Sequence, residues 1–185
     1  MARTQDRRER IIDATVELAE KGGFEAVRLR DVAAASGVAL GTVYRNFSSK
    51  EDLLVGALSR EMEALQRAIR RRPPRGDTPR ALARAFFRAA NRGVLSRPNF
   101  ARAVIRALAT GNPEMHEATA SFHDGNTALI TEVIFGREEV TERDRRVATL
   151  LQNVWFASLV GWTGGLFDES GVLDRIEVAV DRLFD

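Results

Sequence analysis

Several side chains between residues 42 and 50 carry hydrogen-bond donors at closely spaced positions. Arg45 can donate two parallel hydrogen bonds to the major-groove edge of guanine, and Asn46 can pair in a similar bidentate way with adenine. Thr42, Tyr44 and Lys50 are suited to phosphate oxygens, which position a protein on a duplex without reading its sequence. This chemistry requires a short helix that presents one face to the major groove.

The pattern around these residues predicts two short helices that pack at a steep angle. Such a pair requires a small residue at the crossing, a glycine in the turn and a β-branched residue that locks the second helix in place. Ala33, Gly37 and Val43 meet these requirements in order, so the helices are expected over residues 29–36 and 40–46. The small core beneath them is expected to contain Val32, Val38, Phe47 and, from the preceding helix, Ile11, Leu18 and Phe24.

The run GVALGTVYRNFSSKEDLL at residues 37–54 resembles the DNA-binding signature of the TetR family of transcriptional repressors. The resemblance implies a homodimer whose two helix-turn-helix domains bind adjacent major grooves of a near-palindromic operator. Many members have a polar or basic residue at the position of Leu40, and an aromatic residue or histidine at that of Asn46. The expected DNA-binding residues are Arg28, Arg30, Ala39, Leu40, Gly41, Thr42, Tyr44, Arg45, Asn46 and Lys50.

The resemblance also implies a larger C-terminal domain that binds a small-molecule inducer and dimerises through its last two helices, residues 141–184. A longer similarity to the repressors of actinobacterial cholesterol catabolism covers residues 21–27, 54–61 and 154–162, and implies a lipid or steroid acyl thioester as the inducer. The predicted function is a ligand-responsive repressor that a hydrophobic inducer releases from its operator. The alternative is a helical lipid or acyl-CoA carrier without a DNA function.

Helical periodicity predicts an all-α fold of about nine helices. The first helix is expected to end at Lys21-Gly22-Gly23, and a helix over residues 50–72 is expected to end at Pro73-Pro74. The helix over residues 50–72 links a DNA-binding domain, residues 1–50, to a ligand-binding and dimerisation domain, residues 51–185. The remaining helices are expected over residues 78–96, 98–111, 112–136, with Gly125 favouring an interruption, 141–166 and 168–184.

The C-terminal part supplies aromatic side chains for an apolar ligand site, since such sites use aromatic walls with few polar groups. The candidates are Phe86, Phe87, Phe100, Met115, Phe122, Trp155 and Phe156. Apolar stripes on the last two helices favour a symmetric four-helix interface between two copies over burial within one copy. The stripes are Val147, Leu151, Val154, Ser158 and Trp162, then Leu173, Ile176, Val180 and Leu183.

The net charge of +2 conceals a strong asymmetry along the chain. Residues 1–110 contain 22 basic and 12 acidic side chains, and residues 111–185 contain 6 and 14. The basic part suits a polyanion, although the acidic part is equally its intramolecular complement. An arginine stripe repeats every four residues at Arg80, Arg84, Arg88 and Arg92. We expect it to face solvent or the acidic third of the chain rather than the phosphates of a ligand.

Several classes of protein are excluded by what the chain lacks. Without cysteine there is no disulfide, cysteine-ligated metal or thiol nucleophile. His116 and His123 lie seven positions apart, which is too far for a compact chelate, so no metal site is expected. No cofactor and no enzymatic activity are expected either. No apolar run is long enough to span a membrane, and the first residues lack the apolar core of a signal peptide, so a cytoplasmic protein is expected.

Overall fold

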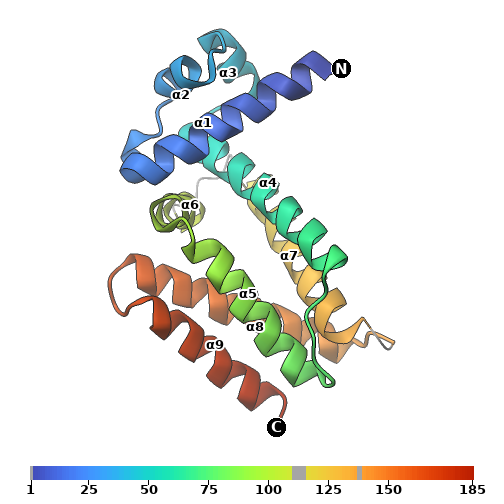
Figure 1. The fold of residues 1–185 in the computed structure, drawn as a ribbon. Coiled ribbons are helices and arrows are strands. Elements are labelled where there is room, and N and C mark those ends of the chain that lie inside the picture. The colour runs from blue at the N-terminus through green and yellow to red at the C-terminus, as the bar shows by residue number, and fades with distance from the viewer. Residues whose placement is uncertain (1, 110–115, 137–138) are drawn as a thin grey trace. The chain divides into compact units, whose positions relative to one another are not determined.

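The computed structural model describes residues 2–109, 116–136 and 139–185, and these residues form nine α-helices and no strand (Figure 1). The prediction of an all-α fold is therefore confirmed for the part of the chain described. The helices are α1 (Ala2–Ala26), α2 (Leu29–Ser36), α3 (Leu40–Asn46), α4 (Lys50–Arg71), α5 (Pro79–Leu95), α6 (Pro98–Ala109), α7 (His116–Phe135), α8 (Glu142–Thr163) and α9 (Glu169–Leu183).

The chain divides into two compact units. Unit 1 comprises Met1–Glu61 and Arg97–Thr119, and unit 2 comprises Met62–Ser96 and Ala120–Asp185. Unit 1 therefore contains α6 as well as the three N-terminal helices, while α4 and α7 contribute residues to both units.

Unit 1 is built on one hydrophobic core shared by α1, α2, α3, α6 and the first half of α4. The residues predicted for this core are buried in it, except Leu18, which is partly buried against it. Gly22 (φ −141°, ψ 15°) and Gly23 (φ 66°, ψ −161°) leave the helical region, so the regular part of α1 ends where the sequence predicted. Phe24 and Val27, which follow this break, return to the core.

The turn between α2 and α3 depends on Gly37, which adopts a left-handed conformation (φ 63°, ψ 30°). The amide of Val38 donates to the carbonyl of Ala33 at 3.1 Å, and the amide of Gly37 donates to that of Ala34 at 3.3 Å. These two bonds satisfy carbonyls at the end of α2, in the pattern of a Schellman cap. The chain is thereby redirected into α3, where Val43 is fully buried.

Gly37→Ala is expected to lower the free energy of unfolding by about 1–2 kcal/mol, because a side chain in the left-handed region is strained. The control is Gly93→Ala in α5, where no described atom lies within 4 Å of the added Cβ. There the helix propensity of alanine should raise the free energy of unfolding by up to about 1 kcal/mol. Urea titrations of both variants measure the difference, and equal changes of one sign would contradict this account of the turn.

Unit 2 contains helices whose first turns are capped by side chains. Thr78 Oγ1 accepts a hydrogen bond from the amide of Ala81 at the start of α5, and Asp168 accepts one from the amide of Gly171 in α9. Thr141 and Asp144 form a reciprocal capping box at the start of α8. These three helices begin within one residue of the starts predicted at residues 78, 141 and 168.

The expected interruption at Gly125 is wrong, because α7 continues through this residue. A glycine inside a helix costs only about 1 kcal/mol relative to alanine. The buried apolar side chains of Leu129 and Ile130 follow it in the same helix, and their packing offsets that cost. The start of this helix, predicted at residue 112, lies outside the described residues.

Most residues of the two apolar stripes pack inside unit 2. Six of them are buried in the single chain: Val147, Leu151, Ser158, Trp162, Ile176 and Val180. The large apolar side chains that α8 and α9 leave exposed are Leu150, Val160 and Val178, at 49%, 37% and 61%. Burial within one copy therefore accounts for most residues of the stripes. Leu150, Val160 and Val178, which are not part of the stripes, are the large apolar side chains of these helices that remain exposed.

Three arginines of the α5 stripe pair with acidic residues of α9, which is one of the two arrangements expected for the stripe. Arg84 Nη2 lies 2.7 Å from Asp181 Oδ2, and Arg80 Nη2 lies 3.0 Å from Asp181 Oδ1. Arg88 Nε donates to Glu177 Oε1 at 2.6 Å. The hydrogen bond from Arg84, followed by that from Arg80, lowers the pKa of Asp181 from its usual value of 3.8.

Because the pKa of Asp181 is lower in the folded chain, its pairing stabilises the fold above pH 4. This contribution is lost as the pH falls through the lowered value. Asp181→Asn should therefore reduce the melting temperature at pH 7, and the difference from the parent chain should shrink below pH 4. Thermal melts at pH 7 and pH 3 test this expectation, and a difference that stays constant with pH would contradict it.

Candidate nucleic-acid interface

The exposed face of α3 brings together most of the predicted DNA-binding residues. Thr42 is half-buried, whereas the other predicted residues from 39 to 46 are exposed: Ala39, Leu40, Gly41, Tyr44, Arg45 and Asn46. Leu40 is 41% and Tyr44 is 58% exposed, although both are large and mainly apolar. Val43 and Phe47, buried on the opposite side, hold this face outward.

Two of the predicted base-reading side chains bond within α3 itself. Arg45 Nη2 donates to Thr42 Oγ1 at 2.7 Å, and Asn46 Nδ2 donates to the carbonyl of Thr42, also at 2.7 Å. Both bonds are exposed to solvent, so exchanging them for bonds to a base or phosphate carries a small net cost. Thr42 thus holds both side chains against the body of the helix in the unbound chain.

Arg28 and Arg30 lie at the start of α2. Arg28 precedes the helix in an extended conformation (φ −123°, ψ 136°), and its carbonyl accepts bonds from the amides of Asp31 and Val32 at 2.9 Å each. The side chain of Arg30 is 71% exposed, and its Nε lies 3.4 Å from Asp31 Oδ1. An exposed pair of this kind contributes little to stability, so the guanidinium can exchange it for a phosphate.

Lys50 is held at the start of α4 by residues from α1. Its ammonium lies 3.9 Å from the centre of the Phe24 ring and 3.4 Å from Glu25 Oε2. Arg106 of α6 stacks on the same ring at 4.3 Å and lies 2.9 Å from Glu25 Oε1. The hydrogen bond from Lys50 is the largest cause that lowers the pKa of Glu25. We call Phe24, Glu25, Lys50 and Arg106 the Phe24 cluster.

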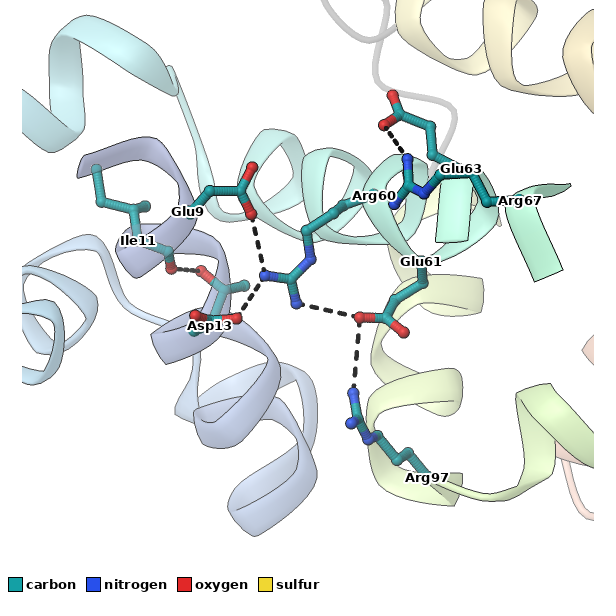
Figure 2. Close-up of polar contacts among 9 residues, drawn as sticks. Glu9, Ile11, Asp13, Arg60, Glu61, Glu63, Arg67 and Arg97 are labelled. Atoms are coloured by element: carbon teal, nitrogen blue, oxygen red, sulfur yellow. Dashed lines mark hydrogen bonds and ion pairs between the residues drawn. The ribbon is translucent and has the colours of Figure 1, made fainter. Parts of the chain in front are cut away.

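A second charged cluster joins α1 to α4 (Figure 2). Arg60 Nη1 contacts Asp13 Oδ1 closely and lies 3.5 Å from Glu9 Oε2, while its Nη2 lies 3.1 Å from Glu61 Oε1. Glu61 also lies 3.6 Å from Arg97, which directly precedes α6. Burial lowers the pKa of Arg60, but the bonds to Asp13 and Glu61 raise it, so the net change is upward. We call this arrangement the Arg60 cluster.

The predicted ligand-binding aromatics are only partly brought together. Phe86, Phe87 and Trp155 are buried in unit 2, with ring centres 5.1 Å apart for the two phenylalanines and 5.8 Å apart for Phe87 and Trp155. Phe100 instead belongs to the core of unit 1. Phe122 and Phe156 are half-buried residues of α7 and α8, and Met115 lies outside the described residues.

Unit 2 also contains buried polar groups that were not predicted from the sequence. Within the described part of the chain, Asn91 Oδ1, Asn126 Oδ1 and Trp155 Nε1 are buried without a hydrogen-bond partner. Asn91 and Asn126 are 7% and 4% exposed, and Asn91 lies one helical turn after Phe87. The signal for Asn91 was available, since a polar residue four positions after a buried phenylalanine falls on the apolar face of the helix.

Among the described residues, no group of three or more His, Asp or Glu side chains is placed to hold a metal ion. No helix in the described ranges has both the length and the apolar character needed to cross a bilayer.

Comparison with known proteins agrees with this geometry. Residues 11–57 match the family described as bacterial regulatory proteins, tetR family, and residues 76–183 match the tetracyclin repressor-like C-terminal domain. The HTH-type transcriptional repressor KstR of Rhodococcus jostii (strain RHA1) is 34% identical over 183 residues, which are 97% of this chain and 83% of that protein. KstR of Mycobacterium tuberculosis (strain ATCC 25618 / H37Rv) is 33% identical, over 97% of this chain and 81% of that protein.

Solved structures share the fold. A TetR transcriptional regulator from Rhodococcus sp. RHA1 superposes with a TM-score of 0.84 and 27% identity, over 97% of this chain and 96% of that one. Thermus thermophilus FadR, a TetR-family repressor solved in complex with lauroyl-CoA, gives a TM-score of 0.78 and 23% identity, over 96% and 93%. Both parts of the chain thus match this family, and the chain belongs to the TetR family of bacterial regulatory proteins.

Proposed function

We propose that this chain is a ligand-responsive transcriptional repressor that binds a near-palindromic operator as a homodimer and is released by a hydrophobic inducer. The observation that carries the proposal is the exposed face of α3, held outward by the Gly37 turn and by the buried Val43 in a member of the TetR family. The activity requires no catalytic step, and it takes place on DNA in the cytoplasm.

The proposed operator interface consists of phosphate contacts and base contacts. Arg28, Arg30, Thr42, Tyr44 and Lys50 carry donors suited to phosphate oxygens. The proposed base-reading residues and the backbone beside them are Ala39, Leu40, Gly41, Arg45 and Asn46. Residues 1–50 form the proposed DNA-binding domain, and residues 51–185 bind the inducer and dimerise, with α4 as the link.

The inducer is proposed to be a lipid or steroid acyl thioester that binds among the aromatic side chains of unit 2. The similarity to KstR over nearly the whole chain supports this ligand class, and the complex of Thermus thermophilus FadR gives an acyl-CoA precedent on the same fold. Phe86, Phe87 and Trp155 supply apolar area, and the unpaired groups of Asn91 and Asn126 suit polar atoms of the ligand. A buried polar group without a partner costs about 1–3 kcal/mol, which a ligand bond would recover.

The proposed dimer uses α8 and α9. The exposed Leu150, Val160 and Val178 would lose their contact with water on association. Release from DNA then requires that the inducer bind more tightly to a dimer whose two recognition helices are wrongly spaced for the operator. By linkage, operator DNA weakens inducer binding by the same factor.

Selection from a pool of random duplexes with the purified full-length chain tests the function. At about 0.15 M salt it should enrich a near-palindromic duplex, whose binding weakens steeply with added salt because phosphate contacts release counterions. A fatty-acyl-CoA or steroid-CoA thioester should release the enriched duplex, while free coenzyme A serves as the control. Thioester binding without enrichment of any duplex would instead support a carrier protein.

A further inference from the structure

Leu40 is a large apolar side chain that the core of unit 1 does not enclose. It begins α3 and is 41% exposed, whereas Val43 and Phe47 of the same segment are 0% and 3% exposed in the core of unit 1. A single exposed leucine is common on protein surfaces. This one, however, lies on the face of the helix that the proposed function places against DNA.

The first turn of α3 presents Leu40 beside open backbone. A Cβ added to Gly41 would have no described heavy atom within 4 Å, and the glycine is not in the left-handed region. The fold therefore does not require a glycine there, and the backbone next to Leu40 is open to close approach. The longer side chains of Arg45 and Asn46 are bonded to Thr42 in the next turns. Leu40 is thus the large side chain that this turn offers to a groove.

We propose that Leu40 reads a thymine in each half-site of the operator, through apolar contact with the C5-methyl group of that base. Leucine has no hydrogen-bonding group, so it can select a base only by shape and apolar contact. Thymine is the one DNA base that presents a methyl group in the major groove. The inference rests on the proposed function, because it requires that α3 enter this groove.

The charges around Leu40 favour a duplex over an apolar protein surface as its partner. Arg28, Arg30 and Arg45 are exposed on the same helix-turn-helix and carry positive charge, and Lys50 follows at the start of α4. An apolar protein partner would have to remove these charges from water without compensation. A duplex supplies both a phosphate for each charge and a methyl group for the leucine.

The test replaces thymines of the selected duplex by deoxyuridine, which pairs identically and lacks only the methyl group. Symmetric replacement at one position of each half-site should weaken binding of the parent chain about 15-fold, or about fourfold per methyl group. Leu40→Ala should bind the thymine duplex more weakly than the parent chain and should lose little further affinity on that replacement. An unchanged sensitivity of this variant to the methyl groups would overturn the proposal.

Leu166→Ala is the matched control, since Leu166 is 79% exposed and lies in unit 2. It should retain both the affinity of the parent chain and its preference for thymine. Thermal melts of Leu40→Ala should match those of the parent chain, because alanine is the best helix former. If a duplex is enriched but no thymine position responds to loss of its methyl group, only the readout proposal fails. If no duplex is enriched, the proposed function fails with it.

Discussion

Phe24→Ala is expected to lower the free energy of unfolding by about 3–5 kcal/mol, the largest effect among the variants considered. The ring is 8% exposed and belongs to the core of unit 1. Its removal opens a cavity beneath the break in α1 and takes away the surface on which Lys50 and Arg106 stack. Urea titration of the full chain, monitored by circular dichroism, measures the change in the free energy of unfolding.

The same substitution should also weaken operator binding beyond its effect on stability. Phe24 and Glu25 together position the Lys50 ammonium, a proposed phosphate contact. Phe24→Leu is the control, because it retains most of the buried volume and removes only the aromatic face. We expect it to preserve most of the stability and to share part of the loss in binding. If Phe24→Ala unfolds at the same urea concentration as the parent chain, the Phe24 cluster does not stabilise unit 1.

The helix-turn-helix was predictable because its signals are local. The left-handed turn needs a glycine, and Gly37 stands where the chain must reverse between two short amphipathic segments. The caps at Thr78, Thr141 and Asp168 are likewise determined by residues within one helical turn. Such features depend on a few neighbouring residues and can therefore be read without a structure.

The clusters that position the interface were not predictable, since they join residues distant in the sequence. Lys50 and Glu25 are 25 positions apart, and Arg60 and Asp13 are 47 apart. Phe100 was predicted for the ligand site because its side chain is aromatic, but the packing of α6 in unit 1 places its ring in the other core. Periodicity identifies the apolar face of a helix, whereas tertiary packing decides what that face contacts.

The same limit of prediction from sequence applies to the arginines of α5 and to the apolar stripes of α8 and α9. Charge counting left both a polyanion and the acidic third open as partners of the basic part, and in the structure three of these arginines pair with acidic residues of α9. The stripes were a weaker guide, because an apolar face is equally satisfied within one chain or between two copies. The structure distinguishes the two cases, since Leu151 and Ile176 are buried within the single chain, whereas Leu150 and Val178 are exposed.

Arg60→Met is expected to lower the free energy of unfolding by about 1.5–3 kcal/mol, because a hydrogen-bonded charge at a partly buried position is lost. The side chain of Arg60 is 20% exposed, and its guanidinium bonds to α1 through Asp13 and to its own helix through Glu61. Without it, the carboxylates of Glu9 and Asp13 lose a shared positive partner at the contact between α1 and α4. Urea titration measures the loss, and duplex binding reports whether α3 still reaches the operator.

Arg97→Met is the matched control for this cluster. Its side chain is 50% exposed, and its guanidinium makes a longer contact of 3.6 Å with Glu61, so its removal should cost less than about 1 kcal/mol. Arg60→Lys should fall between the two, since one ammonium keeps the charge but cannot bond in two directions as the planar guanidinium does. Equal losses for Arg60→Met and Arg97→Met would mean that the carboxylates of α1 are satisfied by water. The junction of α1 and α4 would then be held by the apolar core alone.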